Sequence, residues 1–247
     1  ASVNRRKDGK EKKMAQGIID IHSHILPAVD DGSKSMEMSM DMIQCAYAQG
    51  VRKMIATPHY YPGHRNNTVG KLQETYESLQ AEIGKLYDDF ELYLGQEIYY
   101  KDSVVDLLKS KEILTMAGTR YILIEFPVNC RFEDIDKAVR KTTQAGYYPI
   151  LAHVERYHAL YEKKTLIPEL INTGAYIQVN AENFGMSFFS KERKFCMHHM
   201  KEGNIHFLGS DCHNMTTRKP DMKLAVKYAT DLQLTDNPQK IIEGIFL

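Results

Sequence analysis

Residues 18–24 read Ile-Ile-Asp-Ile-His-Ser-His, and this stretch indicates the first strand of the fold with a metal site at its end. Short apolar runs of this kind are typical of buried strands. Side chains two residues apart in a strand point to the same face, so His22 and His24 can direct imidazole nitrogens at one divalent cation. One such pair is a weak signal, but equivalent positions recur along the chain.

Further short apolar runs end in residues that can bind a metal or move a proton. These runs cover residues 51–58, 90–96, 121–124, 148–152 and 205–210. The candidate ligands that follow them are His59, Glu97, Glu125, His153, Asp211 and His213. Asp31, in an acidic turn after the first run, completes a set of nine with His22 and His24.

Amphipathic stretches of helical length separate most of these runs, at residues 33–49, 68–87, 132–145 and 189–201. Strands that alternate with helices predict βαβ units and a parallel sheet. When such a sheet closes into a barrel, the C-terminal ends of its strands converge on one face. We therefore predict an α/β fold in which the nine candidate ligands meet at that face, although they lie far apart in the sequence.

Length and charge restrict the class of protein. A chain of 247 residues has the size of one α/β barrel. Its 32 basic and 32 acidic residues give no net charge, so nothing favours nucleic acid or a membrane surface as a partner. We find no apolar run near the roughly 18–20 residues that span a bilayer, and no secretory signal peptide. The sequence leaves the oligomeric state open.

The N-terminus and the cysteines add two expectations. Residues 1–13 contain six basic and two acidic residues, which predicts a disordered tail or expression remnant, with Met14 as the natural start. The alternative is a basic arm that binds an acidic surface. Residues 14–247 are expected to form a single domain. Four cysteines without a CxxC pair are typical of free thiols in a reducing cytoplasm.

The chemistry of the donor set indicates the metal. Imidazole nitrogen and carboxylate oxygen suit Mn²⁺, Fe²⁺ or Zn²⁺, and they disfavour a cysteine-type zinc site or an all-oxygen calcium site. One metal takes about four to six ligands, water included, so nine protein donors imply two or three metals close together. Clustered metals are suited to the hydrolysis of phosphate esters.

Six motifs now carry a resemblance. They are DxHxH at residues 20–24, TPH at 57–59, GQEIYY at 95–100, ILIEFP at 122–127, AHVER at 152–156 and SDCHN at 210–214. In this order they resemble the PHP (polymerase and histidinol phosphatase) superfamily. Within it they are similar to the bacterial manganese-dependent protein-tyrosine phosphatases of capsule and exopolysaccharide synthesis. The resemblance covers about residues 17–244.

The resemblance implies a distorted seven-stranded (β/α) barrel with a three-metal cluster, occupied by Mn²⁺ or else by Fe²⁺, Zn²⁺ or Mg²⁺. The first metal would be bound by His22, His24, Glu97 and Asp211. Glu97 would bridge to a second metal, completed by Glu125 and His153. The third would be bound by Asp31, His59 and His213. Glu125 stands where many members of the superfamily have histidine, as in the tyrosine-phosphatase branch.

Two arginines complete the expected site. Arg156 and Arg218 follow ligand positions closely, and a planar guanidinium can bind phosphate through two nitrogens and stabilise developing negative charge. The resemblance gives both a catalytic role. It also implies hydrolysis of phosphotyrosine by a metal-activated hydroxide. The expected substrate is the tyrosine-rich tail of a bacterial tyrosine kinase that controls polysaccharide export.

One motif points to a different mechanism. Residues 212–218 match C-x5-R, the signature of cysteine-dependent tyrosine phosphatases. That mechanism needs backbone N–H groups wrapped around phosphate above a thiolate, and the segment has no glycine that would permit such a loop. Because side chains alternate along a strand, we expect Cys212 to point away from Asp211, His213 and the metals.

Other readings stay open. The nearest are a small-molecule phosphatase of the histidinol phosphate kind and a phosphodiesterase; further ones are an amidohydrolase-type barrel, a non-catalytic polymerase module and a metal-stabilised binding protein. Asp20 is a candidate for orienting an imidazole. Four tyrosines beyond ligand positions could line an aromatic substrate pocket or pack in the core, namely Tyr60, Tyr61, Tyr99 and Tyr100.

Overall fold

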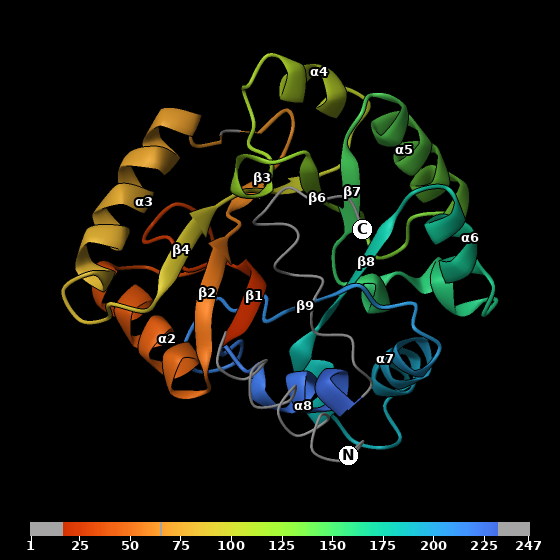
Figure 1. Ribbon diagram of the computed structural model, residues 1–247. Helices are drawn as coiled ribbons and strands as arrows, with labels where there is room; N and C mark the ends of the chain where they lie inside the picture. Colours follow the sequence, from red (N-terminus) through yellow and green to blue (C-terminus); the bar gives the residue numbers. More distant parts are fainter. Residues whose placement is uncertain (1–16, 65, 232–247) are drawn as a thin grey trace, which may run out of the picture.

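The computed structural model describes residues 17–64 and 66–231, in which strands and helices alternate (Figure 1). The expected basic tail and Met14 lie outside the described residues. The strands are β1 (Ile18–Ser23), β2 (Val51–Ala56), β3 (His59–Tyr60), β4 (Glu91–Leu94), β5 (Glu97–Tyr99), β6 (Tyr121–Glu125), β7 (Tyr148–Leu151), β8 (Tyr176–Asn180) and β9 (Phe207–Gly209).

All pairings between these strands are parallel. One sheet has the order β1-β2-β4 and the other has the order β3-β5-β6-β7-β8-β9. The two meet where β1 lies beside β9, through a bridge between Ser23 and Cys212 and a hydrogen bond from His24 N to Cys212 O of 2.9 Å. The expected α/β class is confirmed, with the strands in a curled half-barrel.

The nine described strands occupy seven positions around the curl, because two positions are each split into two short strands. The first split separates β2 from β3 at Pro58, which has no N–H to donate to a neighbouring strand. The second separates β4 from β5 at Gly95, where an added Cβ would lie 2.9 Å from Met116 Sδ. These breaks are the distortion in the seven-stranded arrangement.

Helices surround the curled sheet on its outer side (Figure 1). They are α2 (Met36–Ala48), α3 (Val69–Ile83), α4 (Val104–Lys109), α5 (Phe132–Gln144), α6 (Leu166–Asn172), α7 (Lys191–Lys201) and α8 (Lys223–Asp231), with short 3₁₀ turns η1 (Met116–Gly118), η2 (Val154–Arg156), η3 (His158–Tyr161) and η4 (Ala181–Gly185). The four predicted helical stretches contain α2, α3, α5 and α7. No helix among the described residues is long and apolar enough to cross a membrane.

Side-chain caps determine where three of these helices begin. Ser35, Thr68 and Ser190 each accept a hydrogen bond from a backbone N–H in the first turn of α2, α3 and α7. Helices α2 and α7 therefore start three and two residues later than the amphipathic pattern alone suggests.

Strand β8 was not among the predicted strands. All five of its residues are buried, but Gln178 and Asn180 interrupt its apolar pattern and no predicted ligand follows it. Their side chains make hydrogen bonds within the site described below. The search for apolar runs therefore did not predict β8, because this strand carries two polar side chains that belong to the site.

The inside of the curl is filled by its own apolar cluster. It is formed by Ile21, Ile55, Met116, Tyr121, Leu123, Ile150, Ala152, Tyr176 and Phe207. The ring of Tyr121 packs edge-on against Tyr148, Tyr176 and Phe207, with centroids 5.0, 5.5 and 6.3 Å away. A second, larger cluster lies between the sheet and the helices. Because the interior of the curl is packed with apolar side chains, the candidate ligands lie at the ends of the strands.

Candidate metal centre

The nine predicted ligands lie together at the C-terminal ends of the strands. Eight of them form three groups whose ligand atoms all lie within 4.8 Å of one another. The groups are His22, His24, Glu97 and Asp211; His24, Asp31, His59 and His213; and His59, Glu97 and Glu125. The ninth, His153, places Nε2 2.8 Å from Glu97 Oε1 and 3.8 Å from Glu125 Oε2.

The first group matches the set that the resemblance implied, and it is the most buried of the three. Glu97 Oε2 lies 3.2 Å from Nε2 of both His22 and His24. Asp211 Oδ1 lies 3.5 and 3.4 Å from the same two nitrogens. Neither Glu97 Oε2 nor Asp211 Oδ1 has a hydrogen-bond partner among the described residues. Buried oxygens without such partners, close to imidazole nitrogens, are suited to share a cation.

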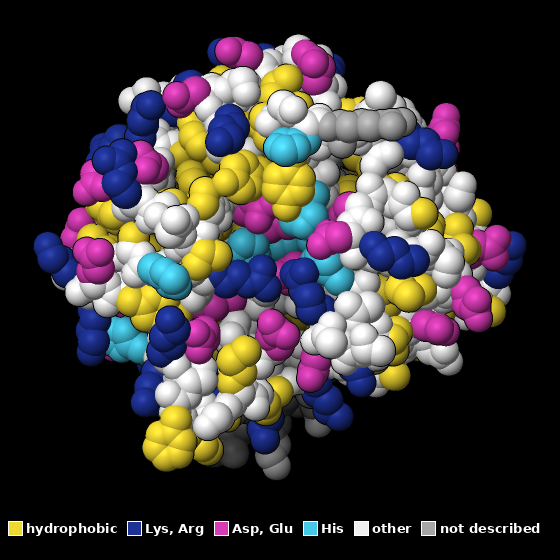
Figure 2. All heavy atoms as spheres, turned by 180° about the vertical axis from the view of Figure 1, so that it is seen from behind, with side chains coloured by type: hydrophobic (Ala, Val, Ile, Leu, Met, Phe, Trp, Pro, Cys, Tyr) yellow, Lys and Arg dark blue, Asp and Glu magenta, His cyan; other side chains and the backbone are white. Residues whose placement is uncertain are grey.

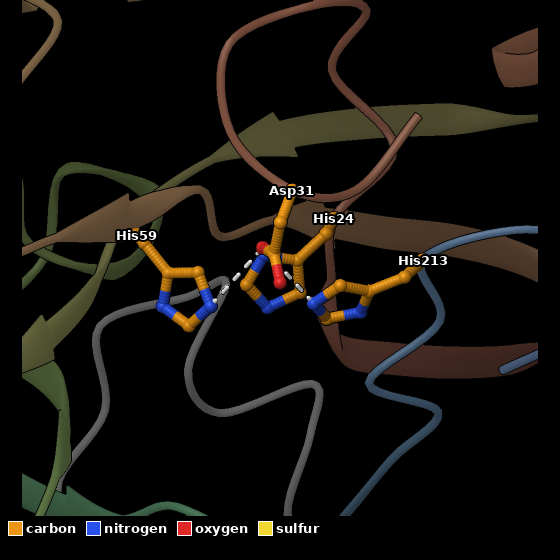
Figure 3. Close-up of side chains that lie close together, drawn as sticks. All are labelled: His24, Asp31, His59 and His213. Atoms are coloured by element: carbon orange, nitrogen blue, oxygen red, sulfur yellow. Dashed lines mark ion pairs between the residues drawn. The ribbon is translucent and has the colours of Figure 1, made fainter. Parts of the chain in front are cut away.

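Figure 3 shows the second group, where Asp31 lies between His59 and His213 with His24 behind it. Asp31 Oδ1 is 3.4 Å from Nε2 of each outer histidine. The side chain of Asp31 is 64% exposed, whereas that of His213 is only 3% exposed. This group is therefore the open side of the site. It includes His24, which the resemblance assigned to the first metal alone.

The third group connects the other two. His59 Nδ1 lies 3.1 Å from Glu97 Oε2 and 3.3 Å from Glu125 Oε1. His59 thus faces both Asp31 and the Glu97–Glu125 pair, although the resemblance placed it at the third metal only. Shared residues bring the three groups into one continuous site, and this arrangement fits a cluster of metals better than three separate ions.

Simple strand alternation explains only some of these positions. On β6, Tyr121, Leu123 and Glu125 face the interior in turn. On β1, however, Ile21 lies in the interior cluster and His22, the next residue, also reaches the site. The pairing of β1 with β2 shifts register between Asp20 and Ser23, and a bulge of this kind redirects a side chain.

Two other ligands depend on unusual backbone angles. His153 has φ 32° and Asp211 has φ 52°, a left-handed conformation that non-glycine residues rarely adopt. His153 follows the inward-facing Ala152, so the turned backbone is what directs its imidazole into the site. Strain of about 1–3 kcal/mol at each such residue is typical of functional sites.

A glycine permits the close approach of β9 to β1. A Cβ on Gly209 would lie 2.5 Å from the Cβ of His22. Asp20 joins the same two strands, because its Oδ1 accepts the backbone N–H groups of His22 at 3.2 Å and Ser210 at 2.9 Å. The expectation that Asp20 orients an imidazole is therefore wrong: this carboxylate binds backbone N–H groups.

Two residues that were not predicted orient the imidazoles instead. Gln178 Oε1 accepts the backbone N–H of His153 at 2.8 Å and lies 3.3 Å from His22 Nδ1. Asp30 Oδ2 lies 2.8 Å from His24 Nδ1 and accepts the backbone N–H of His59 at 3.1 Å. An oxygen at Nδ1 leaves Nε2 free to bind metal. Two signals in the sequence could have identified these residues. Gln178 is a polar residue inside an apolar strand, and Asp30 is a second acidic residue beside Asp31.

Both predicted arginines lie at the site, on a single carboxylate oxygen. Arg156 Nη2 and Arg218 Nη2 are 2.8 and 2.6 Å from Asp211 Oδ2, which also accepts a hydrogen bond of 2.9 Å from Asn180 Nδ2. The two oxygens of Asp211 thus have different neighbours. Oδ2 contacts the two guanidinium groups and an amide, and Oδ1 faces the imidazoles. The arginine side chains are 35% and 32% exposed, so an anion can reach them.

Cys212 lies outside this arrangement. Its side chain is fully buried in the apolar cluster between sheet and helices, as the alternation along the strand predicted. Burial, with the nearby carboxylate of Asp20, raises the pKa of the thiol. A buried thiol with a raised pKa is a poor nucleophile, so the C-x5-R match does not form a phosphate-binding loop.

Charge compensation dominates the electrostatics of the site. Burial opposes charge on Glu97, but the imidazoles of His22 and His153 hold its pKa well below the ordinary value. At His24 burial would lower the pKa, yet contacts with Asp211 and Asp30 raise it well above the ordinary value. The imidazoles and the buried carboxylates therefore favour each other's charged forms, and a cation bound there would compete with protons for the imidazole nitrogens.

The fold and the donor set together define a parallel α/β protein with a histidine- and carboxylate-rich candidate metal centre at the strand ends. A family model for capsular polysaccharide synthesis, CpsB/CapC, matches residues 18–243. The chain belongs to this family, and the resemblance to PHP-type proteins is confirmed.

Individual relatives agree with this assignment. Tyrosine-protein phosphatase CpsB from Streptococcus pneumoniae is 34% identical over 239 residues, which cover 91% of this chain and 98% of the relative. Tyrosine-protein phosphatase YwqE from Bacillus subtilis (strain 168) is 34% identical over 203 residues, 81% of this chain and 79% of the relative.

A solved structure shows the same fold. It comes from work on YwqE from Bacillus subtilis and CpsB from Streptococcus pneumoniae, described as unique metal-dependent tyrosine phosphatases. It is 30% identical with a TM-score of 0.86, and the match covers 93% of this chain and 96% of the other.

We predict that Gln178→Met weakens Mn²⁺ binding about 10- to 100-fold, because His22 loses the oxygen at its Nδ1 while the side-chain length is kept. Calorimetric titration of metal-stripped protein measures this affinity, and the melting temperature checks the fold. Gln73→Ala on the exposed face of α3 is the matched control. An unchanged affinity in a folded Gln178→Met variant would show that Gln178 does not orient the ligand.

We also predict that metal binding weakens as pH falls. Because the pKa of His24 is raised above its ordinary value, protons compete with metal for this imidazole increasingly as pH falls. Each proton that metal displaces lowers the affinity by up to about tenfold per pH unit. Titrations between about pH 8 and pH 6, in buffers of different ionisation enthalpy, measure the affinity and the protons released. An affinity independent of pH would contradict this prediction.

Proposed function

We propose that this chain is a metal-dependent tyrosine-protein phosphatase. The observation that carries the proposal is the pair of arginines on Asp211, directly beside a continuous set of nine candidate metal donors, of which His153 joins through Glu97. Metal donors and guanidinium groups together can surround the oxygens of a phosphoryl group. The named activity of the CpsB and YwqE relatives supports a phosphotyrosine substrate.

We propose Mn²⁺ as the metal, in a cluster of three, with Fe²⁺, Zn²⁺ or Mg²⁺ as other occupants that the donors permit. The donor groups fit this proposal, because buried atoms of Glu97, Glu125 and Asp211 lack hydrogen-bond partners among the described residues. The three groups that share His24, His59 and Glu97 would hold the ions. When bound, such metals supply an activated water and neutralise charge on the phosphoryl oxygens.

The residues of this chain then have distinct tasks. Arg156 and Arg218 bind the phosphoryl oxygens and stabilise the charge that grows on them. Asn180 keeps hold of Asp211 Oδ2 when the arginines turn toward the substrate, so the metal ligand stays in place. The tyrosine phenolate is a good leaving group, and the reaction can therefore proceed without a dedicated acid.

We propose that the substrate is a phosphotyrosine in the tail of a bacterial tyrosine kinase that controls polysaccharide export, and that the two meet in the cytoplasm. The family description links the chain to capsular polysaccharide synthesis. A flexible tail can enter a hollow at the end of a barrel, whereas a phosphotyrosine on a folded surface has less access.

Metal removal tests the proposal. We expect phosphate release from a phosphotyrosine peptide to vanish in metal-stripped protein and to return with Mn²⁺. Arg156→Lys and Arg218→Lys should each lower kcat/KM about 100-fold, because lysine cannot bind phosphate through two nitrogens. Arg140→Lys, exposed on α5, is the control. If the metallated protein releases phosphate from histidinol phosphate but not from the peptide, the enzyme is a small-molecule phosphatase.

Substitution of the buried cysteine separates the metal mechanism from the cysteine mechanism. We predict that Cys212→Ala keeps kcat within about twofold of the wild-type value, since the thiol is buried away from the site. The smaller side chain should lower the free energy of unfolding by about 1 kcal/mol, which a thermal melt reports separately. Complete loss of activity with full metal occupancy would contradict the metal mechanism.

A further inference from the structure

The hollow at the metal centre has two unlike sides. In Figure 2 its floor consists of His, Asp and Glu side chains, while Lys and Arg border one side and side chains of the hydrophobic class, which includes Tyr, border the opposite side. The arginines bind Asp211, next to His22 and His24. A different kind of side chain lies against the ligands His59 and Glu125.

That side chain is Tyr61, two residues beyond His59. Its ring centroid lies 4.9 Å from that of His59 and 5.5 Å from that of Tyr99, with tilted planes. Burial, with the nearby carboxylates of Glu125 and Glu97, raises the pKa of its hydroxyl. Tyr61 thus forms an aromatic wall beside the metal ligands, with the ring of Tyr99 behind it.

The position of Tyr61 is fixed by its backbone and by its ring contacts. Asn66 accepts the Tyr61 backbone N–H and donates to its C=O, both at 2.8 Å, and the ring lies against those of His59 and Tyr99. The side chain is nevertheless only half-buried. A fixed aromatic ring that keeps part of its surface open can receive another ring at little entropic cost.

The neighbouring tyrosines behave differently. Tyr60 and Tyr100 pack against the apolar cluster between the sheet and the helices, and the ring of Tyr100 lies 5.5 Å from that of Phe126. Of the four tyrosines noted in the sequence, two therefore contribute to the core, and Tyr61 and Tyr99 lie at the site. This division provides a control residue directly beside Tyr61.

We propose that Tyr61, supported by Tyr99, is a specificity-determining residue that holds the phenyl ring of the substrate phosphotyrosine. The inference rests on the proposed phosphatase function. It adds the residue that recognises the leaving group, which is the tyrosine side chain of the substrate. When the phosphoryl group lies between the metal donors and the arginines, its ester oxygen points toward the open rim of the hollow. A phenyl ring there can stack on Tyr61, whereas the short alkyl group of phosphoserine cannot.

Paired peptides test this inference in the manganese-loaded protein. The probes are one peptide with phosphotyrosine and the same peptide with phosphoserine at that position. We expect Tyr61→Leu to raise KM for phosphotyrosine and to reduce the ratio of the two kcat/KM values roughly 3- to 10-fold. Tyr61→Phe, which keeps the ring but loses the hydroxyl, should preserve the ratio. Tyr60→Phe is the matched control for the neighbouring position.

A binding measurement provides a readout that is independent of turnover. A peptide with a non-hydrolysable phosphonate analogue of phosphotyrosine should bind Tyr61→Leu more weakly by a similar factor, while inorganic phosphate binds both proteins equally. If Tyr61→Leu lowers kcat/KM for both peptides by the same factor, or weakens Mn²⁺ binding alone, the ring only supports His59 and the inference is wrong. A wild-type protein inactive on the phosphotyrosine peptide would overturn the proposed function, and the inference with it.

Discussion

The site depends on the burial of two carboxylates, Glu97 and Asp211, against the same pair of imidazoles. Each has an oxygen within 3.5 Å of Nε2 of both His22 and His24, and both carboxylates are 1% exposed. Such charges are costly in a protein interior unless cations balance them. The neighbouring imidazoles and arginines lie close enough to provide that balance. The same negative charges attract divalent ions. Because metal and protons compete for the same side chains, the metal affinity depends on pH.

The surrounding structure holds these groups at a fixed spacing. Polar residues of β8 bind the ligands from behind: Gln178 contacts His22 and the backbone of His153, and its amide donates to Asn180, which in turn binds Asp211. Because β8 lies between β7 and β9, one short strand links ligands from three others. Fixing ligands through such a buried network costs flexibility but sets the geometry before metal arrives.

In the proposed function, substrate recognition divides between the two sides of the hollow. Arg156 and Arg218 present charge that suits a phosphoryl group, and Tyr61 with Tyr99 presents aromatic surface. The first feature is common to any phosphoester, whereas the second favours an aryl ester. Preference for phosphotyrosine over other phosphates would then arise at the rim, while the metal centre determines the chemistry.

The sequence by itself determined the βαβ alternation, the strand ends that carry candidate ligands and which nine residues these are, because apolar runs closed by His, Glu or Asp are local patterns. It missed β8, where Gln178 and Asn180 break the apolar pattern, and it misjudged Asp20. Only the tertiary structure decided that His22 and His153 reach the site out of phase with their strands, that both arginines share Asp211, and that Tyr61 rather than Tyr60 faces the ligands. These features depend on a bulge, a left-handed residue and contacts between distant strands, none of which a local pattern specifies.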